Sequence, residues 1–167
     1  GDRVTLTPAP HPGWRFDAWS GPDAGDLSNN GGGSWDLLMD DHKTLTATFI
    51  QDDYTVDVAI VGHGTVTKAP QNEAYHYGDL LTLTAEADPG WTFAAWSGHL
   101  HSAQNPISLT VHSDTAITAT FTQDEYTLGV ATVGDGDVDV DPDQETYAYG
   151  DRVTLTPAPH PGWRFDA

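Results

Sequence analysis

The chain has 167 residues and no cysteine, and 25 acidic residues against six basic ones give it a formal net charge of −19. Binding to nucleic acids depends on clustered Lys and Arg, so this balance excludes a general grip on phosphate and disfavours anionic membrane surfaces. No apolar run approaches the roughly twenty residues that a membrane-spanning helix needs, so we expect no membrane insertion within these residues.

An eighteen-residue block, GDRVTLTPAPHPGWRFDA, occurs twice, at 1–18 and at 150–167. Strand positions tolerate many sequences, so selection for a fold would not keep eighteen letters unchanged, and recent duplication explains them better. Self-similarity of this kind indicates a repeat architecture.

A weaker repeat lies inside the first. Tyr54–Asp79 aligns without a gap on Tyr126–Asp151, a shift of 72 positions, whereas Gly1 aligns on Gly78, a shift of 77. The difference arises because the segment 21–38 is five residues longer than its counterpart after Trp96. We therefore predict three tandem modules: 1–53 is the C-terminal part of one, 54–125 is complete, and 126–167 is the N-terminal part of the next.

Apolar residues recur at every second position through the complete module, which is the period of a half-buried strand. Turn signals separate the runs at 62–64, 77–79 and 88–90. No stretch has the 3.6-residue period of a helix, so the prediction is an all-β module of about six short antiparallel strands. The alternating residues are Tyr54, Val56, Val58 and Ile60; Leu81 and Leu83; Ile107, Leu109 and Val111; and Ile117, Ala119 and Phe121.

The segment PGWTFAAWSG (89–98) recurs as PGWRFDAWSG (12–21). On a regular strand Trp91 and Phe93 share one face and Trp96 takes the other, unless a bulge intervenes. We predict that these rings are packed, and that Trp35, which heads the alternation Trp35, Leu37 and Met39, is also in a core.

Successive modules are joined by four residues, 50–53 and then 122–125. Four residues span at most about 14 Å, too little for two domains to tumble independently. The modules are therefore expected to form beads on a semi-rigid string.

Taken in order, the motifs resemble the divergent internalin-type B-repeat of bacterial and some archaeal surface proteins. The pattern is Tyr-Thr-Val at 54–56, Gly-x-Gly at 62–64, Tyr-x-Tyr-Gly-Asp at 75–79, PGWTFAAWSG at 89–98 and the closing strand at 115–121. The resemblance covers 54–125 and both partial modules. It implies a small β-rich module, β-grasp-like or a small sandwich, strung in tandem on secreted or cell-surface proteins, with no catalytic residues.

The acidic segment GDGDVDVDPDQE (134–145) has two explanations, a hydrated surface suited to solubility or high salt and oxygen ligands for calcium. A flat strand spaces its carboxylates too widely for all of them to chelate one ion, so only the turn from Asp135 to Asp139 could fold around calcium. His99 and His101 would face the same side of an extended loop, but no third ligand is evident and zinc needs at least three. We therefore assign no metal-binding, cofactor-binding or catalytic residue.

The sequence has no cysteine nucleophile, Gly-x-Ser-x-Gly elbow or phosphate loop, so we predict that it is not an enzyme. The prediction is a structural repeat of a long extracellular or cell-surface fibre, stalk or adhesin, whose partners are neighbouring copies joined head to tail, covalently or noncovalently. Two alternatives remain: a calcium-stiffened adhesin repeat, and a module that binds surface glycans by stacking on exposed Trp19, Trp96 or the Tyr75/Tyr77 pair.

The partial modules carry a further expectation. Residues 126–149 correspond to the strands that would precede Gly1, so an isolated chain should fray at both ends or associate head to tail through exposed strand edges.

Overall fold

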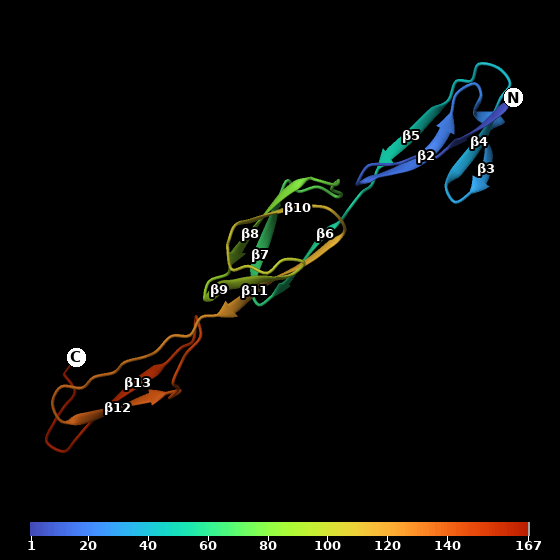
Figure 1. The fold of residues 1–167 in the computed structure, drawn as a ribbon. Helices are drawn as coiled ribbons and strands as arrows, with labels where there is room; N and C mark the ends of the chain where they lie inside the picture. Colours follow the sequence, from blue (N-terminus) through green and yellow to red (C-terminus); the bar gives the residue numbers. More distant parts are fainter. Residues whose placement is uncertain (167) are drawn as a thin grey trace. The chain divides into compact units, whose positions relative to one another are not determined.

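A computed structural model describes residues 1–166 as an all-β chain, with no α-helix among those residues (Figure 1). Ala167, the last letter of the repeated block, lies outside the described residues. The chain divides into two compact units. The first comprises Gly1–Asp57, Ala69–Thr82 and Ser108–Thr115, and the second comprises Val58–Lys68, Leu83–Ile107 and the chain from Ala116 onward.

The first module contains two small antiparallel sheets. One has the order β1-β4-β3, formed by Asp2–Leu6, Ser34–Met39 and Ser28–Gly31. The other pairs β2, Trp14–Ser20, with β5, Thr46–Gln51. The only helical turn among the described residues is a 3-10 turn at Ala24–Asp26, and no described helix could cross a bilayer.

Polar contacts fix the long segment between β2 and β5. Lys43 Nζ lies 2.7 Å from a carboxylate oxygen of Asp26 and 2.8 Å from one of Asp40. The Thr44 amide donates to Asp23 at 2.6 Å. These polar contacts anchor the longer connection of this module.

The complete module has six strands, as predicted: β6 Val56–Val61, β7 Gly64–Ala69, β8 Leu80–Ala87, β9 Trp91–Gly98, β10 Ile107–Thr110 and β11 Thr115–Gln123. They form two sheets, with the orders β10-β8-β7 and β6-β11-β9. Most of the buried apolar side chains belong to this module, and those of β8 and β11 follow the predicted alternation. In β6, Val56 is buried, but Ile60, at the end of the predicted run, is 45 % exposed. The apolar residues of this module with less than 10 % exposure are Val56, Tyr75, Leu81, Leu83, Ala85, Trp96, Val111, Ile117, Ala119 and Phe121.

A β-bulge decides where the aromatic rings point. Opposite β11, the register places Ala95 against Thr120 and Phe93 against Phe121, so one residue of β9 is extra. The Phe93 and Trp96 rings consequently meet at 5.0 Å, and Trp96 is only 1 % exposed. The sequence prediction placed Trp96 on the opposite face unless a bulge intervened, and the structure has that bulge. The prediction that Trp96 is packed is confirmed.

The same bulge occurs in the first module, where the Phe16 and Trp19 rings meet at 5.5 Å. Trp35 joins them, 5.1 Å from Phe16, and Leu37 is buried. Met39, the last residue of that alternation, is 38 % exposed, whereas Trp35 is packed as predicted. No described strand covers that end of β4.

The third module reproduces the opening of the second. The bridge Tyr54–Tyr75 returns as Tyr126–Tyr147. The Tyr75 hydroxyl donates to the carbonyl of Pro70 at 2.8 Å, and that of Tyr147 donates to Pro142 at 2.9 Å. The 72-residue shift therefore relates matching hydrogen bonds as well as matching letters.

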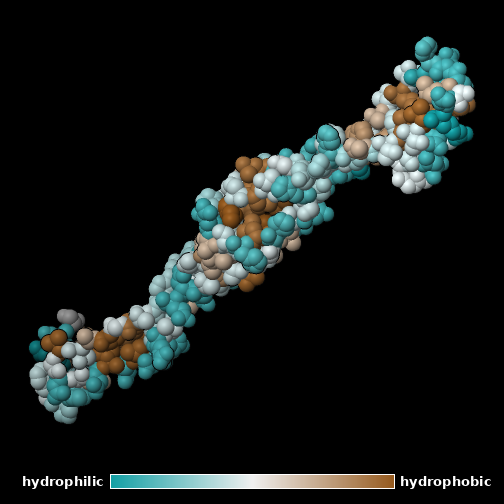
Figure 2. All heavy atoms as spheres, in the orientation of Figure 1, coloured by the Kyte–Doolittle hydropathy of each residue, from teal (hydrophilic) through white to brown (hydrophobic). Residues whose placement is uncertain are grey.

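Beyond that bridge the third module has one two-stranded sheet, β12 Gly136–Asp141 with β13 Thr154–Pro159. Residues 128–133, the counterpart of β6, belong to no strand. Figure 2 shows an apolar patch over this part of the chain. The exposed apolar residues of this module include Leu128, Val130, Val133, Leu155, Trp163 and Phe165.

Candidate functional site

The candidate site is the place where one module meets the linker to the next, and its first element is the Pro-Gly-Trp turn. Trp14 donates its amide to the His11 carbonyl at 3.0 Å, and Trp91 donates to Asp88 at the same distance. The glycines have φ of +75° at Gly13 and +80° at Gly90, which is the third position of a type II turn after proline. Only glycine adopts this conformation readily, so the turn is specified by its sequence.

Each of these turns receives the linker that leads into the following module. In the first unit the Asp52 amide donates to the Gly13 carbonyl at 2.8 Å, and in the second unit the Asp124 amide donates to Gly90 at 2.8 Å. We call these two places the joints.

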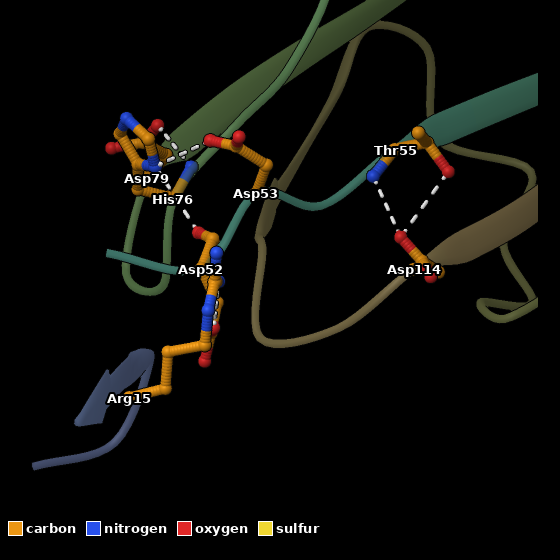
Figure 3. Close-up of polar contacts among 7 residues, drawn as sticks. All are labelled: Arg15, Asp52, Asp53, Thr55, His76, Asp79 and Asp114. Atoms are coloured by element: carbon orange, nitrogen blue, oxygen red, sulfur yellow. Dashed lines mark hydrogen bonds and ion pairs between the residues drawn. The ribbon is translucent and has the colours of Figure 1, made fainter. Parts of the chain in front are cut away.

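Each linker aspartate also accepts a hydrogen bond from a side chain of the strand that follows the turn, β2 or β9. Arg15 donates to the Asp52 carboxylate at 2.7 Å (Figure 3), and the Thr92 hydroxyl donates to the Asp124 carboxylate at 2.6 Å. Arginine and threonine occupy equivalent positions after the tryptophan. Both pairs are solvent-exposed, so they orient the linker more than they stabilise it.

The second tyrosine of the Tyr-x-Tyr-Gly-Asp motif closes each joint. Tyr77 packs so closely on Gly13 that a Cβ on that glycine would overlap the tyrosine Cβ, and Tyr149 has the same relation to Gly90. Glycine is therefore required twice at this turn, for its φ and for its missing side chain.

The first joint has additional polar contacts (Figure 3). His76 Nδ1 lies 3.2 Å from the Asp52 carbonyl and 3.4 Å from the Asp53 carboxylate. The Asp114 carboxylate accepts from the Thr55 amide at 2.8 Å. Every residue from Asp52 to Thr55 thus makes a polar contact or a β-bridge, and these contacts fix the chain over this stretch.

Comparison with known proteins gives the family. The model of the divergent InlB B-repeat domain matches residues 1–53, 54–125 and 126–167. The chain belongs to this family. No curated protein and no solved structure matches it.

The chain is therefore a tandem array of B-repeats, a type of repeat associated with surface proteins. The joints involve the motifs that define the repeat, Pro-Gly-Trp from one and Tyr-x-Tyr-Gly-Asp from the next. Sequence reasoning inferred a short linker but missed these contacts. The available signal was that, along the chain, a Pro-Gly-Trp motif precedes each linker and a Tyr-x-Tyr-Gly-Asp motif follows it.

The structure corrects the prediction that Trp19, Trp96 and the Tyr75/Tyr77 pair are exposed for stacking on glycans. Trp96 and Tyr75 are each 1 % exposed, because one sits inside the bulged strand and the other bridges to Tyr54. Trp19 is half-buried among Phe16 and Trp35. Only Tyr77, 43 % exposed, presents a ring surface, and it stacks on His112 at 4.7 Å.

The acidic segment of this B-repeat array forms a clamp around one histidine. His160 Nδ1 lies 2.7 Å from Asp135, and Nε2 lies 3.1 Å from Asp137. Hydrogen bonds to Asp135 and then Asp137 raise the pKa of His160 above its usual value. Asp139, Asp141 and Asp143 do not take part in these contacts.

No group of three or more His, Asp or Glu side chains is arranged to hold a metal within residues 1–166. His99 and His101 are both exposed. Calcium binding at the Asp135–Asp139 turn stays a prediction of the sequence.

Proposed function

We propose that this chain is a non-catalytic structural segment of an extracellular or cell-surface fibre, stalk or adhesin, with modules at 1–53, 54–125 and 126–167. The observation that supports this most directly is the likeness of the two joints. Asp52 and Asp124 make the same 2.8 Å backbone bond to Gly13 and Gly90, although the modules they connect differ in sequence and length.

A repeated joint gives a repeated step from one module to the next. β5 reaches Gln51 and β11 reaches Gln123, so only two of the four predicted linker residues lie outside the strands, and they span at most about 7 Å. The glycine–tyrosine contact also restricts rotation of the following module. In a solenoid or array, stability and geometry follow from such nearest-neighbour interfaces. A shaft needs this property, whereas a chain of independently moving binding domains does not.

The charge fits the same role. A net charge of −19 over 167 residues keeps neighbouring chains apart through mutual repulsion and keeps a long array hydrated.

Localisation on the producing cells tests the proposal. Intact cells are labelled with a membrane-impermeant biotin reagent that reacts with amines, for which Lys68 is the target, and thin sections are stained with immunogold against residues 54–125. We expect biotinylation without lysis and gold along structures outside the envelope. A cytosolic enzyme is the control for lysis, and gold confined to the cytoplasm would refute the proposal.

A further inference from the structure

An asparagine followed by a glycine lies at the end of β3, where the chain turns into β4 (Figure 1). Asn30 is the extra residue of a β-bulge, because the register passes from Asn29 opposite Trp35 to Gly31 opposite Ser34. A bulged residue is left out of the ladder, so pairing with β4 does not fix the backbone at Asn30. This peptide can therefore move more freely than one in a regular strand.

The turn itself requires the glycine after Asn30. Gly31 has φ +82°, and Gly32 and Gly33 continue with φ of +63° and +82°. Only glycine adopts this conformation readily. No other part of the chain lies within 4 Å of the Cβ position at any of the three glycines, so the requirement comes from backbone conformation and not from lack of space.

An asparagine in this position can react with the backbone of its neighbour. The Gly31 amide nitrogen loses its proton to a base and attacks Cγ of Asn30, and the missing Cβ of glycine leaves that approach open. A five-membered succinimide ring forms, the bond from Cγ to Nδ2 breaks, and the nitrogen leaves as ammonia. Water then opens the ring at either carbonyl, which gives aspartate or an isoaspartate whose main chain runs through Cβ and Cγ. Water is the only co-reactant consumed.

We infer that Asn30 is a site of covalent modification, which is converted to aspartate or isoaspartate as the chain ages. The reaction depends only on groups within β3, β4 and the turn that joins them. It goes beyond the proposed surface role and does not rest on it.

The other three asparagines of the chain lack this reactivity. Asn29 and Asn72 are followed by residues with long polar side chains, which hinder the attacking nitrogen. Asn105 is followed by proline, whose nitrogen has no proton to lose. Its side-chain amide also exchanges two hydrogen bonds with the Ala85 backbone, at 2.9 Å and 2.7 Å. The modification is therefore expected at Asn30 and not at these positions.

Three hydrogen bonds hold the reacting groups in another arrangement. The Gly31 amide donates to Asn29 Oδ1 at 2.8 Å, and the Ser34 hydroxyl donates to Asn30 Oδ1. Asn30 Nδ2 donates to the Asp36 carboxylate at 3.1 Å. Ring closure brings Asn30 Cγ onto the Gly31 nitrogen and so competes with all three bonds. The folded hairpin therefore slows the reaction.

The products disturb the contacts of Asp36. This carboxylate accepts from Asn30 and, at 2.7 Å, from the Thr5 hydroxyl. An ionised carboxylate in place of the Asn30 amide has no proton to donate, and it adds a like charge beside Asp36. Isoaspartate also adds a carbon to the main chain, which moves Gly31 out of register with Ser34. Either product should therefore release β3 from β4.

Peptide mapping of the 167-residue chain during incubation at mildly alkaline pH tests the inference. Digestion with pepsin in acid, where the ring forms slowly, is followed by mass spectrometry. We expect the peptide that contains Asn30 to gain the mass difference between NH2 and OH and to separate into two products on chromatography. Peptides with Asn72 and Asn105 should keep their mass. No change at Asn30, or equal change at all three, would overturn the inference.

A matched pair of variants tests the hydrogen bonds. Ser34→Ala removes the bond to Asn30 but keeps the Asn-Gly pair, and should speed the conversion by about twofold to fivefold. Ser108→Ala removes a hydroxyl that lies 3.0 Å from that of Thr82 in the complete module, and should leave the rate at Asn30 unchanged. Equal rates in the two variants, or no acceleration of the unmodified chain in urea, would show that the hairpin does not slow the reaction.

Asn30→Asp reproduces one product directly and separates its effect from the chemistry that forms it. Amide protection over Ser28–Gly31 should fall, because the bond to Asp36 is lost and a like charge is added. Protection in the sheet formed by β6, β11 and β9 should stay the same and serves as the internal control. Unchanged protection over Ser28–Gly31 would refute the release of β3.

Discussion

Gly90→Ala tests whether the joint is a real interface. Gly90 has φ +80° and lies against Tyr149, so an added methyl group strains the turn and pushes the tyrosine away. Gly78→Ala is the matched control. Its φ is +91°, but no atom lies within 4 Å of the Cβ position.

The two substitutions share one cost and differ in another. A side chain at positive φ costs roughly 1–2 kcal/mol at either site. Gly90→Ala should also weaken the bond from the Asp124 amide, whose net value is about 0.5–1.5 kcal/mol. We expect unfolding free energies lowered by about 1–2 kcal/mol in Gly78→Ala and by about 2–3 kcal/mol in Gly90→Ala.

Urea unfolding followed by tryptophan fluorescence measures the free energies, and amide exchange at Asp124 reports on the joint alone. Exchange at Asp124 should rise about fivefold in Gly90→Ala, the factor that 1 kcal/mol carries, and stay constant in Gly78→Ala. If both variants leave Asp124 equally protected, the turn does not hold the linker and the joint argument fails.

Two further predictions concern single side chains. Trp96→Phe removes the hydrogen bond from Nε1 to the Gln104 carbonyl at 3.0 Å, whereas Trp19 Nε1 is buried without a partner among the described residues. Trp96→Phe should therefore lower the free energy of unfolding by about 1 kcal/mol more than Trp19→Phe does. Urea titration measures both, and the reverse order would contradict the prediction. Since Asp135 and Asp137 raise the pKa of His160, its protonation stabilises the fold below the unfolded pKa of about 6.5, and this contribution is lost as pH rises through the higher folded pKa. Replacing both aspartates with Asn should lower the NMR titration midpoint of His160, and an unchanged midpoint would refute the clamp.

Much of the architecture could be predicted because alternation and turn chemistry are local. Leu81 and Leu83 point inward and Thr84 outward, as the period of two requires. The position of Trp96 also depends on the bulge in β9. This bulge arises from pairing with β11, and no residue type in the sequence marks it.

The candidate site was less accessible to sequence reasoning. Gly13 lies against Tyr77, and the Asp52 amide donates to the Gly13 carbonyl. Both contacts join residues that are far apart in the sequence. The exposure of Met39 could not be read from the sequence for a related reason: alternation tells which face a side chain takes, but not whether another strand covers that face.

The duplicated block gives an internal experiment on how context shapes a peptide. DRVTL at 2–6 is wholly strand, whereas in the same five letters at 151–155 only the last two are strand. Phe16 is half-buried, and its duplicate Phe165 is 63 % exposed. Spectra of the chain should therefore contain pairs of chemically identical residues with unequal shifts and exchange rates. An antibody raised against this peptide would meet one epitope in two conformations, so its stoichiometry would report how many copies are accessible rather than how many exist.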